Sequence, residues 1–414
     1  MEYGCIGARL AHSFSKEIHA HLADYRYELV ELTAEELPHF MRTADFRAIN
    51  VTIPYKKDVI PYLSEISPEA KRIGAVNTVI NRDGHLYGYN TDFFGILSAM
   101  KRMGFPSLAG KKVLILGTGG TSLTAIAVAE HLGAASIVRV SRTAKEDAVS
   151  YEEAPRLHSD AQILFNASPA GMYPNAEDAP LLSLSDFPKL EGVFDAVYNP
   201  LRTNLILEAE RRGIAAIGGL YMLVAQAFRA VEIFLDTTLD PLLLEKTYES
   251  ILSQKESIVL IGMPSCGKTT VGRALAERTG RTFLDLDECI VKEAGRPIPE
   301  IFATDGEVAF RDLESRVIAA LCHQNGLVIA TGGGAVLREE NRRRLKQNGR
   351  LCFLDRPVEQ LTPTADRPTA ASEEAILRRF SERYPIYTAA ADCRIPAEGS
   401  VEETLARLER SLSL

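Results

Sequence analysis

The octapeptide GMPSCGKT (residues 262–269) decides the fold of the region around it. It satisfies the pattern G-x-x-x-x-G-K-[S/T], in which successive backbone N–H groups surround phosphate oxygens. The apolar segment SIVLI (257–261) precedes this loop, and a helix-like run follows it as far as Gly280. We therefore predict a strand, a phosphate-binding loop and a helix, and the pattern indicates phosphoryl transfer from ATP.

Two side chains of this loop have separate chemical tasks. Lys268 can neutralise the transferring phosphoryl group, and Thr269 offers a hydroxyl to Mg²⁺. The helix that follows adds partial positive charge at its N-terminus. The predicted ATP-binding residues are Gly262, Met263, Pro264, Ser265, Cys266, Gly267, Lys268, Thr269 and Thr270.

A second glycine loop, GTGGTS (117–122), lies upstream between the apolar segment KKVLIL (111–116) and a helix-like run to Leu132. This order is typical of a dinucleotide pyrophosphate site, although the third glycine of G-x-G-x-x-G is missing. The next strand ends at Ser141-Arg142-Thr143, where a carboxylate would favour NAD and Arg142 favours the 2′-phosphate of NADP. The predicted NADP-binding residues are Gly117, Thr118, Gly119, Gly120, Thr121, Ser122, Ser141, Arg142 and Thr143.

The pattern of strands and helices along the 414 residues predicts an α/β chain with parallel sheets. We expect an α/β substrate-binding domain at 1–102, completed by a helix at about 220–250. A Rossmann-like domain is expected at 103–219 and a P-loop domain, similar to nucleoside monophosphate kinases, at 256–414. The first of these includes a predicted hairpin, in which Asp83-Gly84 turns one strand back onto the next.

The composition of the chain argues against several other classes of protein. The net charge of -8 gives no indication of binding to nucleic acid or an anionic membrane, and no apolar run is long enough to span a bilayer. Charged residues in the first twenty positions argue against a signal peptide. The six cysteines form no CxxC pair, which favours reduced thiols over disulfides or zinc. We expect a cytoplasmic enzyme acting on small molecules, and the oligomeric state stays open.

From residue 256 to about 395 the chain resembles shikimate kinase. FLDLDECI contains the family's D-x-D pair, Asp285 and Asp287, and the segment with VAFRDLE contains Arg311. ATGGGAV and ERYPIY supply the remaining motifs. The resemblance implies that Asp285 helps Thr269 to hold Mg²⁺ and that Asp287 is the base for the attacking hydroxyl. It implies that the shikimate-binding residues are Asp287, Arg311, Gly332, Gly333, Gly334 and Arg383.

The segment LTPTADRPTAAS (361–372) departs from that family. It corresponds to the loop that closes over ATP, and it keeps Arg367-Pro368 but lacks the two leucines that follow in the family. It is also short. By resemblance we expect Arg367 to contact ATP and to stabilise charge on the phosphoryl oxygens.

Residues 3 to about 240 resemble shikimate dehydrogenase. The motifs are HSFS, NVTIPYKK, GAVNTV, GYNTDFFG, NASPAGM, VYNPLRT and GGLYMLVAQA. The resemblance implies that Lys56, oriented by Asp92, exchanges the proton at the carbonyl oxygen. It implies that Gly219 and Met222 lie beside the NADP cofactor. The implied shikimate-binding residues are Ser13, Ser15, Thr52, Lys56, Asn77, Asp92, Tyr198 and Gln226.

Together the two resemblances indicate a bifunctional enzyme of aromatic amino-acid biosynthesis. Its first half would reduce 3-dehydroshikimate with NADPH, and its second half would phosphorylate shikimate with ATP and Mg²⁺. Two alternatives remain. The second half could be a degenerate, kinase-like nucleotide sensor beside an active dehydrogenase, or the dehydrogenase could prefer quinate or NAD.

Overall fold

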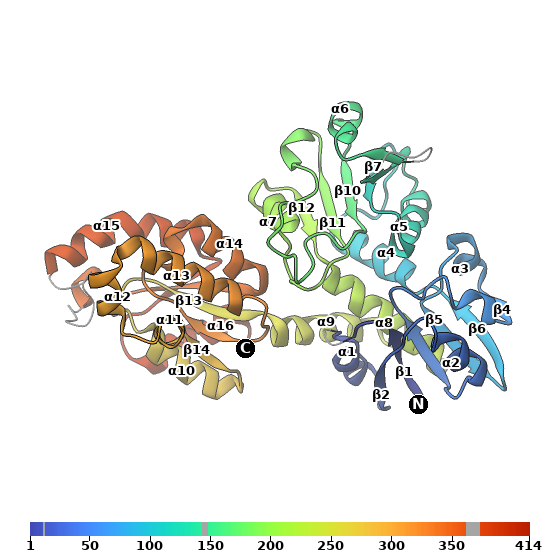
Figure 1. Cartoon of the computed structure of the whole chain (residues 1–414), viewed down its shortest axis with the longest axis horizontal. Coiled ribbons are helices and arrows are strands. Elements are labelled where there is room, and N and C mark those ends of the chain that lie inside the picture. The colour runs from blue at the N-terminus through green and yellow to red at the C-terminus, as the bar shows by residue number, and fades with distance from the viewer. Residues whose placement is uncertain (11–12, 143–147, 362–372) are drawn as a thin grey trace. The chain divides into compact units, whose positions relative to one another are not determined.

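The computed structural model describes residues 1–10, 13–142, 148–361 and 373–414. The chain folds into two compact units, Met1–Ile251 and Leu252–Leu414 (Figure 1). None of the helices in the described part of the chain is both long and apolar enough to cross a membrane.

The first unit begins with a mixed six-stranded sheet in the order β2-β1-β3-β5-β6-β4. The strands are β1 (Tyr3–Gly7), β2 (Tyr27–Glu31), β3 (Ala48–Val51), β4 (Glu65–Ile66), β5 (Thr78–Arg82) and β6 (His85–Tyr89). The surrounding helices are α1 (Ser15–Leu22), α2 (Leu37–Thr43) and α3 (Pro68–Ile73). The predicted hairpin is confirmed: β5 and β6 pair antiparallel, and Asp83 and Gly84 have φ of 53° and 86°. Two positive φ values are what a type I′ turn requires.

A second, wholly parallel sheet follows in the order β12-β11-β10-β7-β8-β9. Its strands are β7 (Lys112–Leu116), β8 (Ser136–Ser141), β9 (Ala148–Ser150), β10 (Ile163–Asn166), β11 (Gly192–Asp195) and β12 (Ala215–Ile217). Its helices are α5 (Gly120–His131), α6 (Glu153–His158) and α7 (Asn204–Arg211). The chain moves outward from β7 to β9 and then returns to β10 on the other side of β7. The strand order therefore reverses between β7 and β10, where open parallel sheets bind their ligands.

Three further helices belong to the first unit or lead out of it: α4 (Asp92–Arg102), α8 (Gly219–Leu235) and α9 (Pro241–Lys255). The prediction of one helix over about 220–250 was wrong, because Asp236 leaves the helical region with φ of 49° and Pro241 begins a new helix. Helices α4 and α8 pack closely. A Cβ atom at Gly95 would lie 2.7 Å from the backbone oxygen of Met222, so only glycine permits this approach.

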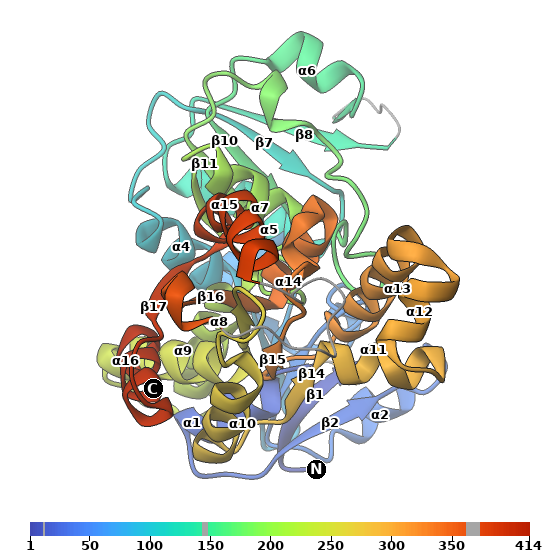
Figure 2. The same cartoon turned by 90° about the vertical axis from the view of Figure 1, so that its left-hand side faces the viewer.

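The second unit contains one parallel five-stranded sheet in the order β14-β15-β13-β16-β17. Its strands are β13 (Ser257–Ile261), β14 (Phe283–Asp285), β15 (Val328–Ala330), β16 (Gly349–Asp355) and β17 (Cys393–Pro396). Its helices are α10 (Lys268–Thr279), α11 (Leu286–Ala294), α12 (Ile298–Thr304), α13 (Gly306–Leu321), α14 (Glu339–Asn348), α15 (Glu373–Ala390) and α16 (Val401–Leu412). Helices α11, α12 and α13 lie together in both views (Figure 1, Figure 2).

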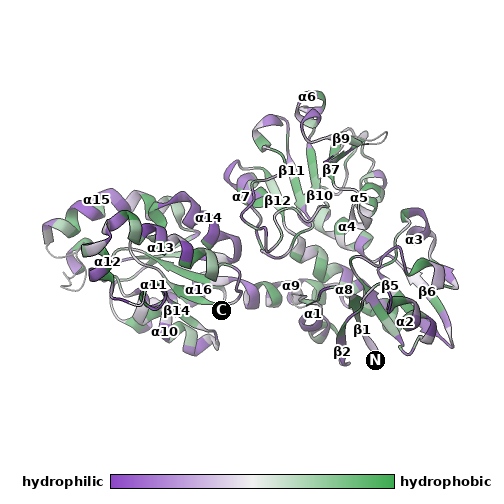
Figure 3. Cartoon of the chain, in the orientation of Figure 1, coloured by the Kyte–Doolittle hydropathy of each residue, from purple (hydrophilic) through white to green (hydrophobic). Residues whose placement is uncertain are grey.

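Hydropathy follows this arrangement. The central strands are apolar, whereas the outer helices carry their polar residues away from the sheet (Figure 3). In β13 all five residues are buried, as expected for a central parallel strand covered on both faces. The predicted α/β class, with parallel sheets in both units and a mixed sheet at the start, is confirmed.

Candidate active sites

Lys56 and Asp92 form a close ion pair in the first unit. Lys56 Nζ lies 2.5 Å from Asp92 Oδ2, and the two side chains are 13% and 7% exposed. Asp92 is the first residue of α4, and the backbone oxygen of Lys56 accepts a hydrogen bond from Val76 N at 2.8 Å. The structure thus brings together two predicted catalytic residues. Because the carboxylate holds the ammonium in place, its remaining N–H bonds can point in fixed directions.

Thr91 connects the predicted substrate residues beside this pair. Its backbone N–H donates to Asn77 Oδ1 at 2.7 Å, and its hydroxyl lies 3.0 Å from Asn77 Nδ2 and 3.3 Å from Gln226 Oε1. Thr78 completes the cluster, with its hydroxyl 3.1 Å from that of Thr91. Sequence reasoning missed Thr91 and Thr78. The only local signal was that Thr91 precedes the helix at Asp92, as an N-cap residue does.

The remaining predicted substrate residues lie at the ends of β3, α1 and β11. Thr52 follows β3, and its backbone N–H donates to Ile6 O at 2.9 Å. Ser13 Oγ and Ser15 Oγ are 3.1 Å apart at the start of α1. The ring of Tyr198 packs against Phe14 with centroids 5.2 Å apart, and burial raises the pKa of its hydroxyl to about 12. Tyr198 is therefore a neutral hydrogen-bond donor at physiological pH.

The predicted cofactor loop lies at the reversal of strand order between β7 and β10. Gly117 has φ of 107°, and a Cβ atom there would lie 3.1 Å from Ala167 O, in the loop that follows β10. A Cβ atom at Gly120 would lie 3.6 Å from Lys56 Cδ, so this loop is adjacent to the catalytic pair. Gly119 caps α5, with Thr118 and Thr121 on either side, and the Ser122 hydroxyl is buried without a partner among the described residues.

Charge at the end of β8 agrees with the predicted preference for a 2′-phosphate. Ser141 is buried as the last residue of β8, Arg142 is exposed after it, and Thr143 lies outside the described residues. Met222 is buried on α8. Gly219 begins α8, where a Cβ atom would lie 2.2 Å from Ala196 O, so no larger residue fits. These features fit a dinucleotide phosphate placed across the ends of β7, β8 and β10.

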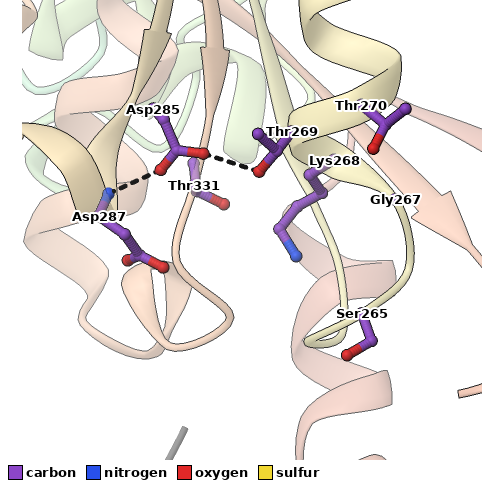
Figure 4. Close-up of a pocket in the computed structure, with 8 residues that line it drawn as sticks. All are labelled: Ser265, Gly267, Lys268, Thr269, Thr270, Asp285, Asp287 and Thr331. Carbon is purple, nitrogen blue, oxygen red and sulfur yellow. Dashed lines mark hydrogen bonds between the residues drawn. The ribbon is translucent and has the colours of Figure 1, made fainter. Parts of the chain in front are cut away.

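A cavity of about 290 Å³ occupies the predicted phosphate site of the second unit (Figure 4). Its lining residues are Ser265, Gly267, Lys268, Thr269, Thr270, Asp285, Asp287 and Thr331. Among the other predicted loop residues, Gly262 has φ of 145° and Met263 and Cys266 are buried. A Cβ atom at Gly333 would lie 2.9 Å from Pro264 Cδ. Lys268 Nζ donates to Gly262 O at 3.0 Å and Met263 O at 2.8 Å.

Oxygen atoms suited to Mg²⁺ lie on one side of this cavity. Thr269 Oγ1 donates to Asp285 Oδ2 at 2.7 Å, and Asp285 Oδ1 accepts from Asp287 N at 2.9 Å (Figure 4). No cluster of three or more His, Cys, Asp or Glu side chains occurs in the described part of the chain. The donor set therefore fits Mg²⁺, which keeps several waters and binds through few protein oxygens together with substrate phosphates.

The predicted acceptor residues gather around the glycine triplet after β15. A Cβ atom at Gly334 would lie 2.2–2.4 Å from the guanidinium of Arg311, and a Cβ atom at Gly332 would lie 2.8 Å from Asp287 Oδ1. Arg383 Nη1 donates to Gly333 O at 3.1 Å. The structure thus brings both predicted carboxylate-binding arginines and the predicted base to one glycine-lined surface. Arg367 lies outside the described residues, as does the rest of the predicted lid from 362 to 372.

Two further ionisable residues lie close to the predicted carboxylate-binding arginines. Glu314 pairs with Arg311 at 2.7 Å, and its other oxygen is buried without a partner in the described structure. Burial raises the pKa of Glu314, although Arg311 opposes the shift. Arg379 lies one helical turn before Arg383, and its Nη1 is likewise buried without a described partner. Sequence reasoning missed Arg379, for which the i, i+4 spacing to Arg383 was the available signal.

Comparison with known proteins assigns the two parts of the chain to two different families. The family model described as "Shikimate dehydrogenase substrate binding domain" matches residues 5–79, and that described as "Shikimate kinase" matches residues 264–412. Shikimate dehydrogenase (NADP(+)) of Clostridium perfringens strain SM101 is 34% identical over 267 residues, which are 60% of this chain and 97% of that protein.

Solved structures agree with this assignment. Shikimate dehydrogenase 1 from Peptoclostridium difficile is 35% identical with a TM-score of 0.56, over 61% of this chain and 98% of that one. Shikimate 5-dehydrogenase from Thermus thermophilus, solved with NADP(H) and shikimate, is 31% identical with a TM-score of 0.54, over 60% of this chain and 99% of that one. Through its first unit the chain therefore belongs to the shikimate dehydrogenase family, and its second unit is a shikimate kinase domain.

Proposed function

We propose that the first unit reduces 3-dehydroshikimate to shikimate with NADPH and that the second unit phosphorylates the 3-hydroxyl of shikimate with ATP and Mg²⁺. In the first unit the ion pair between Lys56 and Asp92 supports the proposal most directly, because Gly120 of the cofactor loop lies beside Lys56. In the second unit the supporting feature is the cavity that Lys268, Thr269 and Asp287 line together.

In the reduction, NADPH supplies the hydride. Lys56 gives its proton to the carbonyl oxygen of the substrate, while Asp92 keeps the ammonium in line with that oxygen. Thr52, Asn77 and Gln226 bind the ring hydroxyls, and the buried Thr91 hydroxyl holds the Asn77 and Gln226 amides in place. The 13% exposure of Lys56 allows the amine to recover a proton from solvent after each turnover.

In the phosphorylation, ATP supplies the phosphoryl group and Mg²⁺ neutralises charge on its phosphates. Asp287 accepts the proton of the attacking hydroxyl, and Arg311 and Arg383 hold the substrate carboxylate. Lys268, which lines the cavity, would place its ammonium charge against the phosphate oxygens. Gly333 and Gly334 keep side chains out of the acceptor position.

Two assays on the full chain test this proposal: shikimate-dependent reduction of NADP⁺, and shikimate-dependent formation of ADP from ATP. Lys56→Met should abolish only the first, and Lys268→Ala only the second, so each variant is the folding control for the other. Absence of both activities from folded protein would overturn the proposal. Shikimate-independent nucleotide binding without ADP formation would favour the sensor alternative for the second unit. Turnover of quinate and NAD⁺ in the first assay decides the substrate and cofactor preference.

A further inference from the structure

A buried carboxylate, Asp195, lies below the predicted cofactor site without belonging to any motif of the sequence. Asp195 is the last residue of β11 and is 0% exposed. Its Cα is in register with that of Asn166, the last residue of β10. Both residues therefore lie at the carboxyl edge of the parallel sheet, next to the reversal of strand order.

Three donors from two different loops converge on Asp195. Asn166 Nδ2 and the backbone N–H of Val197 donate to Oδ1 at 2.9 and 3.0 Å, and the Thr203 hydroxyl donates to Oδ2 at 2.6 Å. No partner of this carboxylate among the described residues is a cation. Ionising a buried carboxyl group that only neutral donors contact costs free energy, because dipoles alone stabilise the negative charge. Burial accordingly raises the pKa of Asp195 to about 7, although the three donors lower it.

The first loop held by Asp195 follows β10 and runs beside the pyrophosphate loop. Asn166 Oδ1 accepts from Ser168 N at 3.1 Å and from the Ser168 hydroxyl at 2.6 Å, and its Nδ2 also reaches Ala170 O at 3.3 Å. The intervening Ala167 carbonyl approaches Gly117. The orientation of the Asn166 amide thus fixes the conformation of this loop. Asp195 in turn fixes that orientation, because its carboxylate accepts a hydrogen bond from Asn166 Nδ2.

The second loop follows β11, contains the predicted substrate residue Tyr198 and contacts the start of α8. Val197 O accepts from Gly219 N at 2.9 Å, and Tyr198 follows directly. At the far end of the loop, Thr203 caps α7 by accepting from Ile206 N at 3.3 Å while donating to Asp195. Both loops and the start of α8 are consequently tied to one side chain.

We propose that Asp195 is a positioning residue for the dehydrogenase reaction: its carboxylate fixes the loops after β10 and β11 so that the nicotinamide end of the cofactor is held against the substrate. An amide changes this network, because asparagine could keep the Asn166 and Val197 bonds only by turning its NH₂ group toward Thr203, whose hydroxyl would then have to accept rather than donate. The inference rests on the proposed function of the first unit.

The experiment uses the full chain at pH 8, with Asp195→Asn, Thr203→Val and Thr203→Ser beside the wild type. Thr203→Val removes the 2.6 Å hydrogen bond and keeps the side-chain volume, whereas Thr203→Ser keeps the hydroxyl. We expect kcat/KM for NADP⁺ to fall about 100-fold in the first two variants, with a higher KM for NADP⁺, because displaced loops misplace the cofactor. Thr203→Ser should stay within about threefold of the wild type, and the kinase rate should be unchanged throughout.

NADPH binding to the same four proteins is measured by the fluorescence of the bound dinucleotide, which separates this inference from the proposed function. Weaker binding in Asp195→Asn and Thr203→Val, with recovery in Thr203→Ser, supports the positioning role even if the wild type failed to turn over shikimate. The positioning role would be overturned if Asp195→Asn and Thr203→Val kept the wild-type dissociation constant for NADPH and the wild-type KM for NADP⁺, and lost activity only in proportion to the fraction of unfolded protein. Equal impairment of Thr203→Val and Thr203→Ser would also overturn it.

Discussion

Separating Lys56 from Asp92 tests both the stability and the chemistry of the first unit. Their charged atoms are 2.5 Å apart and nearly buried. At an effective dielectric constant of about 20 this distance corresponds to an attraction of about 7 kcal/mol, most of which offsets the desolvation of both groups. Asp92→Asn leaves the ammonium without its counter-charge, so we expect the free energy of unfolding of this unit to fall by about 3 kcal/mol.

Lys56→Met leaves the complementary carboxylate alone and should cost a similar amount. Removing both charges together should cost less than the sum of the single changes, with a coupling of about 2 kcal/mol, because neither charge is then left unpaired. Activity should behave differently. Each single variant should lose about a thousandfold in dehydrogenase kcat, and the double variant should lose hardly more, since the pair acts as one device.

Amide hydrogen exchange followed by mass spectrometry gives the required stabilities. Peptides from β3, β5 and β6 report opening of the mixed sheet, and peptides from β13 and β16 of the second unit serve as an unchanged reference in the same sample. Kinase activity provides a second internal control. A double variant whose loss equals the sum of the single losses within about 0.5 kcal/mol would refute the ion-pair reasoning. An Asp92→Asn enzyme within about tenfold of wild-type turnover would refute the catalytic role.

Three further outcomes are expected. Gly334→Ala should raise the KM of the kinase for shikimate about tenfold with little change for ATP, measured by steady-state kinetics, because the new Cβ would lie 2.2 Å from the Arg311 guanidinium and displace it. Arg142→Asp should reduce the preference for NADP⁺ over NAD⁺ about 100-fold, measured as the ratio of the two kcat/KM values, because it places an anion beside the 2′-phosphate. The pKa of Asp195 is raised to about 7 in the fold, so this residue stabilises the first unit below about pH 4 and loses that effect as the pH rises through 7. Asp195→Asn should therefore remove a contribution of about 3 kcal/mol to the fall in unfolding free energy between pH 5 and 8, as followed by urea unfolding with proteolysis of the first unit.

Local backbone signals predicted most of the fold. The turn at Asp83-Gly84 and the helix ends before Gly133 and Gly280 were readable because each depends on a few adjacent residues with positive φ. The break between α8 and α9 was missed although a polar stretch follows Asp236 and Asp240-Pro241 is a helix-start signal.

The candidate sites were predicted unevenly for a similar reason. A residue whose role depends on partners far along the chain is not identified by the sequence immediately around it. Thr91 contacts Gln226 across 135 residues, and Asp195 contacts Asn166 across 29. Asp195 ends an ordinary apolar strand, where an acidic residue is normally a solvated loop residue. Only the register of β10 and β11 turns it into a buried acceptor, and that register is a property of the folded sheet.

The sites of the two units differ in how their residues are distributed along the sequence. The loop that surrounds the phosphates in the second unit is made by consecutive residues between β13 and α10, so it is recognisable as one segment, although Asp285, Asp287 and Thr331 complete the cavity from elsewhere in the chain. The site of the first unit collects side chains from the ends of β3, β5 and β11 and from α4 and α8. Its central contacts join residues 36, 14 and 135 positions apart. A dispersed site relies on buried residues such as Thr91 and Asp195 to hold its members in register. Substitutions outside the substrate-contacting residues should therefore impair the dehydrogenase more often than the kinase.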